Sequence, residues 1–257
     1  MTDPARRHGC IVAALLLLST GARADADCAF EPQGEGRVVA VIDGRSFRLD
    51  DGREIRLAGI ERTGTDAARG RAALSAIIGG RDVTLHGEDD APDRYGRQPA
   101  FVFATGSETS VQGEMLRRGE ALASVDVTDR DCAAALAAAE GVARQAKKGV
   151  WADPAVIKNA ESAGDILAGM GRFLVVEGRV MSVRQVGATT YLNFGRNWTQ
   201  DFAATISRRT MPAFESAGIG AKSLENRRIR VRGYIWSRGG PRIELLRVGQ
   251  VEVLSVK

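Results

Sequence analysis

The chain has 257 residues, a net charge of +4 and two histidines. One of these, His86, follows an apparent strand, where an ordinary surface or edge position explains it. Sites of the Ser-His-Asp or Cys-His type and histidine-rich zinc sites are therefore not expected.

The N-terminus is typical of a secretory signal peptide. Basic Arg6 and Arg7 precede an apolar run from Cys10 to Leu18, and Ala22-Arg23-Ala24 supplies a small-x-small cleavage site. The alternative is a membrane anchor, but the run is about half the ~20 residues that a spanning helix needs. We therefore expect residues 1–24 to be removed and the mature protein to be exported, periplasmic or secreted, with no membrane segment.

Two cysteines, Cys28 and Cys132, remain after the leader. An even number in an exported chain predicts one disulfide, which would stabilise the fold by ~2–4 kcal/mol. The alternative is a pair of buried free thiols.

Residues 25–151 are expected to form one domain of small strands and helices. Expected strands are Arg37–Ile42, Ser46–Leu49, Glu54–Leu57, Arg81–His86 and Ala100–Ala104; expected helices are Ala67–Ile78, Ser110–Arg118 and Ala133–Ala146, the last capped by Asp131. The order β-β-β-α-β-β-α-α predicts an α+β fold, a five-stranded OB-type barrel with packed helices.

A second small OB-like barrel is expected at residues 171–257, after a linker at residues 152–170. Its expected strands are Phe173–Arg184, Thr190–Phe194, Asp201–Ile206, Arg228–Trp236 and Pro241–Leu246, with a brief helix at Met211–Phe214.

The two halves differ in charge. Residues 171–257 hold fifteen Lys and Arg against six Asp and Glu, a net charge of +9, while residues 25–170 carry −7. Basic strands interleaved with aromatic residues favour single-stranded nucleic acid or an extended peptide as the partner of residues 171–257. Trp198, Arg230 and Trp236 are the candidate binding residues; the alternative is core aromatics and a merely soluble basic surface.

Residues 36–151 resemble the thermonuclease (staphylococcal nuclease-like) family. The resemblance is carried by Val41-Ile42-Asp43-Gly44, Arg56-Leu57, the turn Asp93-Arg94-Tyr95-Gly96-Arg97, and a last helix with Glu140, Arg144 and closing Trp151. It implies the barrel fold and calcium-dependent hydrolysis of phosphodiester bonds, and it makes Arg94 and Tyr95 candidate binding residues.

The resemblance also assigns roles to individual residues. Arg56 and Arg97 match the family's two arginines, and Glu61 matches one metal carboxylate. Arg45 stands where a second carboxylate is expected, and Gly64 stands where the family has a glutamate base. The family's nucleotide-seating tyrosines fall near Val125 and Val127.

These departures argue against catalysis. A guanidinium ~4 Å from a divalent cation is repelled by roughly 8 kcal/mol at an effective dielectric constant near 20, and losing a general base costs ~10²–10⁴ in rate. We expect Arg45 to pair with Glu61 in a site without metal or cofactor. Arg56 and Arg97 then either retain a phosphate-binding role or form ion pairs with nearby carboxylates, namely Glu61, Asp43 or Asp93.

Three readings remain open, and the oligomeric state is not given by the sequence. The first is a catalytically inactive, exported family homologue that acts as a binding module. The second is an active nuclease using Ca²⁺ in a shifted site, with Asp66, Glu88, Asp89 or Asp90 as substitute carboxylates. The third is an envelope module for protein-protein interaction and assembly.

Overall fold

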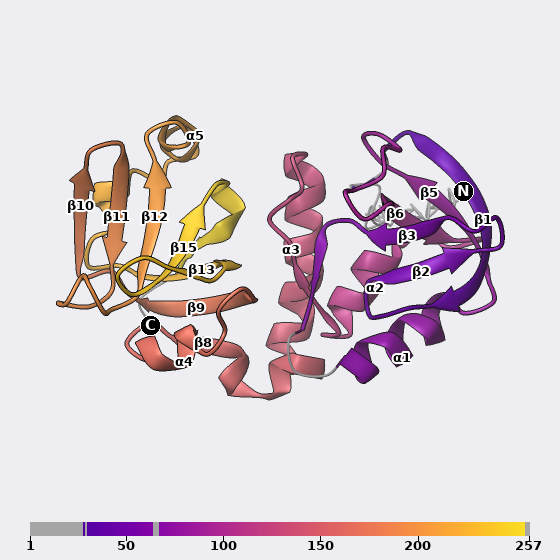
Figure 1. Cartoon of the computed structure of the whole chain (residues 1–257), viewed down its shortest axis with the longest axis horizontal. Helices are drawn as coiled ribbons and strands as arrows, with labels where there is room; N and C mark the ends of the chain where they lie inside the picture. Colours follow the sequence, from indigo (N-terminus) through magenta and orange to yellow (C-terminus); the bar gives the residue numbers. More distant parts are fainter. Residues whose placement is uncertain (1–27, 29, 64–66, 255–257) are drawn as a thin grey trace, which may run out of the picture.

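The computed structural model describes residues 28, 30–63 and 67–254, which form two domains lying side by side (Figure 1). The predicted signal peptide lies outside the described residues. None of the helices that the structure describes has the length and apolar character needed to cross a membrane.

The first domain combines short strands with three helices in the described part of the chain. In order, its elements are β1 (Pro32–Val41), β2 (Ser46–Leu49), β3 (Glu54–Leu57), β4 (Ile60–Arg62), α1 (Ala67–Ile78), β5 (Asp82–His86), β6 (Gln98–Ala104), α2 (Val111–Arg117), β7 (Ala121–Ala123), α3 (Arg130–Gln145) and the 3₁₀ turn η2 (Gly149–Ala152).

Five of these strands close into a barrel in the order β1-β2-β3-β6-β5, with β3 and β6 parallel. The barrel forms because its strands alternate: Phe47 and Leu49 of β2 are buried inside it, while Arg48 between them is exposed. The predicted five-stranded α+β fold is therefore confirmed. The short pair β4-β7 was not predicted, and it carries Glu61.

Helix α3 begins earlier than predicted, and its cap is Asp129 rather than Asp131. The Asp129 carboxylate accepts a hydrogen bond from the Cys132 N–H at 2.8 Å. Asp131 lies instead in the first turn, where its negative charge still favours the helix N-terminus.

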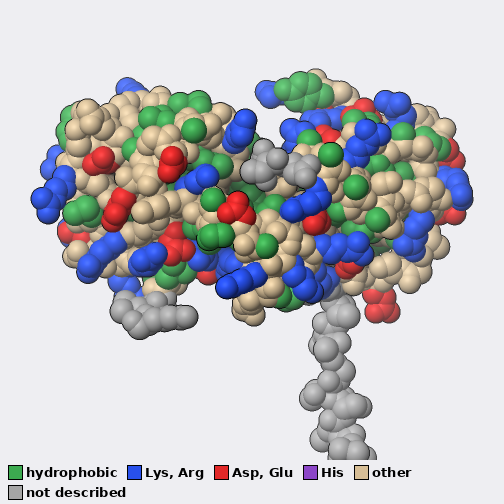
Figure 2. Space-filling view, turned by 90° about the horizontal axis from the view of Figure 1, so that it is seen from below, with side chains coloured by type: hydrophobic (Ala, Val, Ile, Leu, Met, Phe, Trp, Pro, Cys, Tyr) green, Lys and Arg blue, Asp and Glu red, His purple; other side chains and the backbone are tan. Residues whose placement is uncertain are grey.

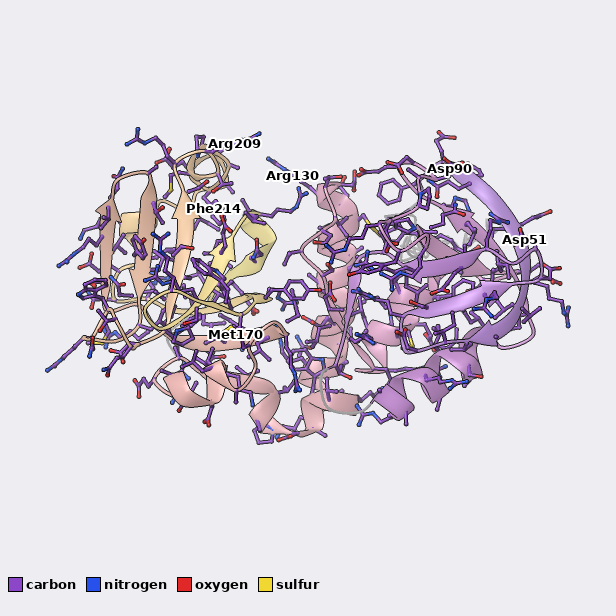
Figure 3. All side chains as sticks on the ribbon, in the orientation of Figure 1. Asp51, Asp90, Arg130, Met170, Arg209 and Phe214 are labelled. Atoms are coloured by element: carbon purple, nitrogen blue, oxygen red, sulfur yellow. A yellow bond between two sulfur atoms is a disulfide. The ribbon has the colours of Figure 1, made fainter. Side chains whose placement is uncertain are left out.

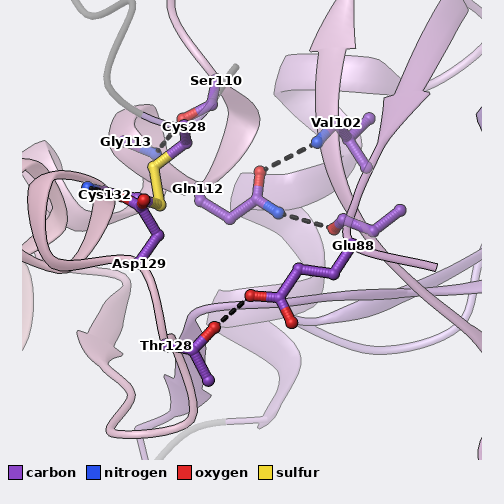
Figure 4. Close-up of a disulfide and its surroundings, with 10 residues drawn as sticks. Cys28, Glu88, Val102, Ser110, Gln112, Gly113, Thr128, Asp129 and Cys132 are labelled. Atoms are coloured by element: carbon purple, nitrogen blue, oxygen red, sulfur yellow. Dashed lines mark hydrogen bonds between the residues drawn. A yellow bond between two sulfur atoms is a disulfide. The ribbon is translucent and has the colours of Figure 1, made fainter. Parts of the chain in front are cut away.

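The predicted disulfide is present between Cys28 and Cys132 (Figure 4). It ties the residue just before β1 to the first turn of α3. Nearby, the buried side chain of Gln112 on α2 accepts from Val102 N–H at 3.2 Å and donates to Ala100 C=O at 2.8 Å (Figure 4). Both links fasten helices to the barrel.

The second domain contains the remaining strands that the structure describes, β8 to β16. Its elements are β8 (Ile157–Asn159), α4 (Ala163–Leu167), β9 (Phe173–Arg179), β10 (Ser182–Val186), β11 (Thr189–Asn193), β12 (Ala203–Ser207), α5 (Met211–Ser216), β13 (Arg228–Tyr234), β14 (Trp236–Ser237), β15 (Pro241–Leu245) and β16 (Val251–Val253), with 3₁₀ turns η3 (Pro154–Val156), η4 (Ala221–Leu224) and η5 (Val248–Gln250).

These strands form two sheets, β10-β11-β12-β15-β14 and β16-β13-β9-β8, rather than one closed barrel. Phe173–Arg184, expected as one strand, bends after β9 and enters the other sheet as β10. The pairing order nevertheless follows the first domain: a meander leads to β12, β12 pairs in parallel with β15, a short helix follows β12, and β13 pairs with β9. The domain is OB-like in connectivity.

Residues 152–170, expected to be a linker with a short helical piece, contain the helix α4 and also pack into the second domain. Ile157–Asn159 pairs in parallel with β9 as β8, and Ile166 of α4 is fully buried in the core of the second domain. A three-residue strand is too short to show an alternating pattern, which explains why the sequence did not reveal it.

The two domains share a small apolar core of their own. Leu122, Ala143, Val150 and Trp151 of the first domain pack with Phe173 and Val175 of β9. Because one cluster is filled from both sides, the domains are fixed against one another.

Candidate functional site

Arg45 reaches the site from the tight turn between β1 and β2. The Asp43 carboxylate accepts a hydrogen bond from the Arg45 backbone N–H at 2.8 Å and shapes this turn. Gly44 lies against α1, where an added Cβ would come within 3.1 Å of Gly70 Cα. A glycine here lets the turn approach the helix closely, which fixes the position of Arg45.

Glu61 arrives from the other side, on β4, and meets the Arg45 guanidinium. Arg45 Nη1 donates to the Ile60 carbonyl at 2.8 Å and to Glu61 Oε2. Both side chains are largely buried, with 12% and 6% exposed. The pairing expected from the sequence is therefore present. Glu61 Oε1 is buried and has no hydrogen-bond partner among the described residues.

The acidic residues around Arg45 do not make a calcium site. Ca²⁺ takes about six to eight oxygen ligands, but Glu61 is paired with Arg45, and Asp43 Oδ2 faces Arg62 Nη1 at 3.1 Å. Within residues 28, 30–63 and 67–254, no group of three or more His, Cys, Asp or Glu could hold a metal ion. The donor set does not fit the ion that the family resemblance implies.

Arg56 of β3 lies beside this pair as a second cation. Burial lowers the pKa of Arg56, and the positive charge of Arg45 lowers it further, while the carboxylate of Glu61 acts in the opposite direction. Its ion pair with Asp126 is a long one, 3.9 Å from Nη2 to Oδ2, and its Nε is buried with no partner in the described part of the chain. Arg56 is a weakly neutralised cation.

Arg97 is held by its own turn. Its Nε and Nη2 donate to Asp93 Oδ2 at 3.1 and 2.8 Å. Partial burial raises the pKa of Asp93, but the hydrogen bonds from Arg97 and from the Tyr95 N–H outweigh it and bring the pKa down to about 2. Tyr95 is exposed, with the guanidiniums of Arg94 and Arg97 at 4.8 and 5.0 Å from its ring centroid.

The remaining positions named from the sequence fall in several places. Gly64 and Asp66 lie outside the described residues. The Glu88 carboxylate accepts a hydrogen bond from the Thr128 hydroxyl near the disulfide (Figure 4). The Asp89 carboxylate accepts one from the Ala91 N–H.

The other three positions named from the sequence, Asp90, Val125 and Val127, lie in separate parts of the first domain. Asp90 is near the upper edge of the first domain (Figure 3). Val125 packs against the shared core of the two domains, and Val127 packs against the barrel core. Neither valine offers a ring to seat a nucleotide.

One family model matches part of the chain. The family model described as staphylococcal nuclease homologue matches residues 55–153, from β3 to just beyond η2. Residues 55–153 are a staphylococcal nuclease homologue domain. No curated protein matches the chain. Strands β1 and β2, and with them Arg45, precede the matched residues but complete the same closed barrel.

The second domain docks on the nuclease-homologue domain through one face of β13. Residues two apart share a face of a strand, so Arg228, Arg230, Arg232 and Tyr234 lie in one row. Arg232 Nη2 donates to Glu140 Oε2 of α3 at 2.7 Å, and both side chains are buried. This pair crosses between the domains and was not foreseen from the sequence.

Arg230, predicted to contact nucleic acid, instead forms ion pairs with two glutamates. Its guanidinium donates to Glu177 Oε2 and Glu252 Oε2, both at 2.7 Å, and only 12% of the side chain is exposed. Glu252 also accepts from Arg144 of α3 at 3.1 Å. The cross-strand register places Glu177 directly opposite Arg230, which a single strand's sequence cannot reveal.

Tyr234 ends this row next to the Arg45–Glu61 pair. Burial raises the pKa of Tyr234, and the negative charge of the nearby Glu61 raises it further. A pocket of about 340 Å³ is lined by Arg45 and Glu61 from the first domain and by Arg172 and Tyr234 from the second. The second domain therefore contributes to the family site.

The predicted aromatic residues lie on the other sheet of the second domain. Trp198 is 66% exposed in the loop before β12, while Trp236 of β14 is half-buried. The Arg242 guanidinium lies 5.7 Å from the Trp236 ring centroid and 5.1 Å from that of Tyr191. The sequence indicated Trp236 but not Tyr191 or Arg242.

Proposed function

We propose that the protein is an exported homologue of the nuclease family that does not cleave nucleic acid, and that its second domain binds single-stranded nucleic acid. The observation that carries the first part is the Arg45–Glu61 ion pair. Hydrolysis needs an activated water and a cation for the developing charge. A guanidinium bonded to the family carboxylate leaves no place for a hydrated metal.

Export is supported by the leader pattern of residues 1–24 and by the disulfide. A stable Cys28–Cys132 bond needs an oxidising compartment, such as the periplasm or the extracellular medium.

Binding is supported by the charge of the second domain. Polyanions are attracted by clustered Lys and Arg, and single strands are held by exposed rings on which bases stack. The basic residues and Trp198 of the second domain supply both properties.

The test is a nuclease assay on the mature protein with denatured DNA, with and without calcium. We expect no cleavage in either condition. The matched variant, Arg45→Asp with Gly64→Glu, restores the two carboxylates of the family pattern, and calcium-dependent cleavage by this variant alone would support the proposal. Calcium-dependent cleavage by the unaltered protein would establish the active-nuclease reading instead.

Binding is tested on the same protein with a labelled oligonucleotide. We expect association that weakens as salt is raised, because bound cations are released from the phosphates. A protein that neither cuts nor binds the oligonucleotide would contradict the nucleic-acid assignment and favour the protein-assembly reading.

A further inference from the structure

The five-stranded sheet of the second domain has one face turned away from its core. Leu192, Ala204 and Ile243 are neighbours across β11, β12 and β15 and are fully buried in the core. Alternation sends their sequence neighbours to the opposite side, which we call the outer face. Tyr191, Thr205, Arg242 and Trp236 lie on this outer face.

Small side chains lie between larger ones on the outer face. Ala203 and Thr205 of β12, the central strand, are both 4% exposed. Across the sheet, Thr205 has Tyr191 as a neighbour, and Ala203 has Arg242, which in turn lies opposite Trp236. The Arg242 guanidinium is near the rings of both Tyr191 and Trp236. The result is a shallow platform of two rings and a cation.

Two hydrogen-bond donors on this platform have no acceptor. Arg242 Nε and Trp236 Nε1 are buried and make no hydrogen bond within the described part of the chain, and Arg242 itself is only 5% exposed. Buried donors are normally satisfied. Because both atoms are covered, a ligand acceptor such as a phosphate or base carbonyl oxygen would satisfy them only if the covering side chains moved aside.

Arginines without an ion pair lie on the strands and connecting loops of this sheet. Five exposed arginines form no ion pair among the residues described by the structure: Arg184, Arg196, Arg208, Arg209 and Arg238. By contrast, three arginines of the other sheet each form an ion pair with a glutamate: Arg228, Arg230 and Arg232. Arg209 lies at the upper end of the domain, before α5 (Figure 3).

Trp198 lies at one end of this sheet. It belongs to the loop between β11 and β12, and a Cβ on Gly239 would lie 3.8 Å from Thr199 in that loop. The loop after Trp236 therefore adjoins the loop that carries Trp198.

We propose that this outer face is a base-stacking site for single-stranded nucleic acid, with Tyr191, Trp236 and Trp198 as the rings and Arg242 as the central cation. This inference rests on the proposed function and assigns it to one surface. Stacking accepts any base because every base has a π face. The arginines at the rim would follow the phosphates.

The experiment is fluorescence anisotropy of a labelled oligothymidylate with the mature protein and its variants. Trp236→Ala should weaken binding by about 5- to 150-fold, the range given by the loss of one stacked base. Trp236→Phe should retain most of the affinity. The control Arg228→Gln removes one positive charge from the other sheet, where Arg230 still neutralises Glu177, and should change affinity little.

Two competitors separate stacking from simple charge attraction. An abasic oligomer of the same length carries phosphates without bases, and poly-glutamate carries negative charge on a peptide. We expect both to compete poorly. Equal competition by either would overturn the stacking assignment in favour of a general polyanion or peptide surface.

The outcomes also separate this inference from the proposal on which it rests. Oligothymidylate binding that is unchanged in Trp236→Ala, Trp198→Ala and Arg242→Gln, each with an unaltered melting temperature, would overturn the outer-face site while leaving nucleic-acid binding intact. The absence of any binding at low salt would contradict both.

Discussion

Arg45 gives Glu61 a positive partner but none of the chemistry of a metal ion. A bound cation can lower the pKa of a water molecule and leave coordination positions open for a phosphate oxygen. A guanidinium instead presents fixed N–H donors, and here Nη1 donates both to Ile60 C=O and to Glu61 Oε2. The guanidinium thus supplies Glu61 with a countercharge but offers no open coordination position for a water or a phosphate oxygen.

The burial of this pair makes it important for stability. Arg45→Ala should lower the free energy of unfolding by about 3–5 kcal/mol, because it leaves Glu61 buried without a countercharge. Urea denaturation checks this. The control Arg48→Ala breaks an exposed 3.9 Å contact with Glu54 and should cost roughly 0–1 kcal/mol. Equal small losses in both variants would mean that the buried pair is not formed.

The Asp93–Arg97 turn gives a pH-dependent prediction. The pKa of Asp93 in the folded protein is about 2, below its ordinary value of 3.8. The unfolded chain therefore takes up this proton first, so the stabilisation by Asp93 is complete above about pH 4 and is lost as the pH falls towards 2.

Asp93→Asn should flatten the dependence of the urea midpoint on pH within this window. Asp90→Asn, which removes an exposed carboxyl, is the matched control and should leave the slope unchanged. A titration by NMR that found the ordinary pKa for Asp93 would contradict the expectation.

At the scale of elements, the barrel strands were predictable and the contacts between elements were not. Ser46–Leu49 and Glu54–Leu57 are strands because apolar and charged residues alternate along them. The same alternation in Arg228–Tyr234 also identified a strand, β13. It did not show that the charged row faces Glu177, Glu252 and Glu140, since partners across a sheet depend on register and packing.

The candidate site was likewise predictable from the sequence only in part. The family pattern predicted the partnership of Arg45 and Glu61 because their positions along the chain match the motif. It gave no sign of Tyr234, which comes from another domain, or of Arg242, whose neighbouring rings lie on β11 and β14. Asp129 was missed as the cap of α3 because Asp131, two residues later, offers the same side chain.

The link between the N-terminal segment and α3 gives a prediction at this scale. Cys28→Ser with Cys132→Ser should lower the free energy of unfolding by ~2–4 kcal/mol, since the bond closes a loop of 104 residues. Urea denaturation of the oxidised protein, the reduced protein and the double variant checks this. The reduced protein should match the variant, and a stability equal to that of the oxidised form would argue against a contribution from the bond.

At the scale of the whole molecule, the charge asymmetry is partly internal. The acidic first domain and the basic second domain meet through Glu140–Arg232 and Arg144–Glu252–Arg230, so some of the opposite charges neutralise one another. On the face seen from below, basic and acidic side chains are interspersed over both domains (Figure 2). The net charge of a domain is therefore a poor measure of what remains for a ligand, and the unpaired arginines of the outer face are a better one.

The Arg232–Glu140 pair should decide how firmly the domains hold together. Glu140 is 1% exposed and accepts both from Arg232 and from the Ala123 N–H at 2.9 Å. Arg232→Met leaves that carboxylate buried and unpaired, which should cost about 3–5 kcal/mol of unfolding free energy and increase proteolysis between the domains.

Adding Glu140→Gln to Arg232→Met removes the stranded charge but keeps an acceptor for the Ala123 N–H. The double variant should therefore recover most of the stability lost in the single variant, as urea denaturation and limited proteolysis would show. Arg228→Gln, at an exposed position of the same row, should cost roughly 0–1 kcal/mol. If the double variant were as unstable as Arg232→Met, packing of the arginine stem rather than its charge would be what holds the second domain over the family site.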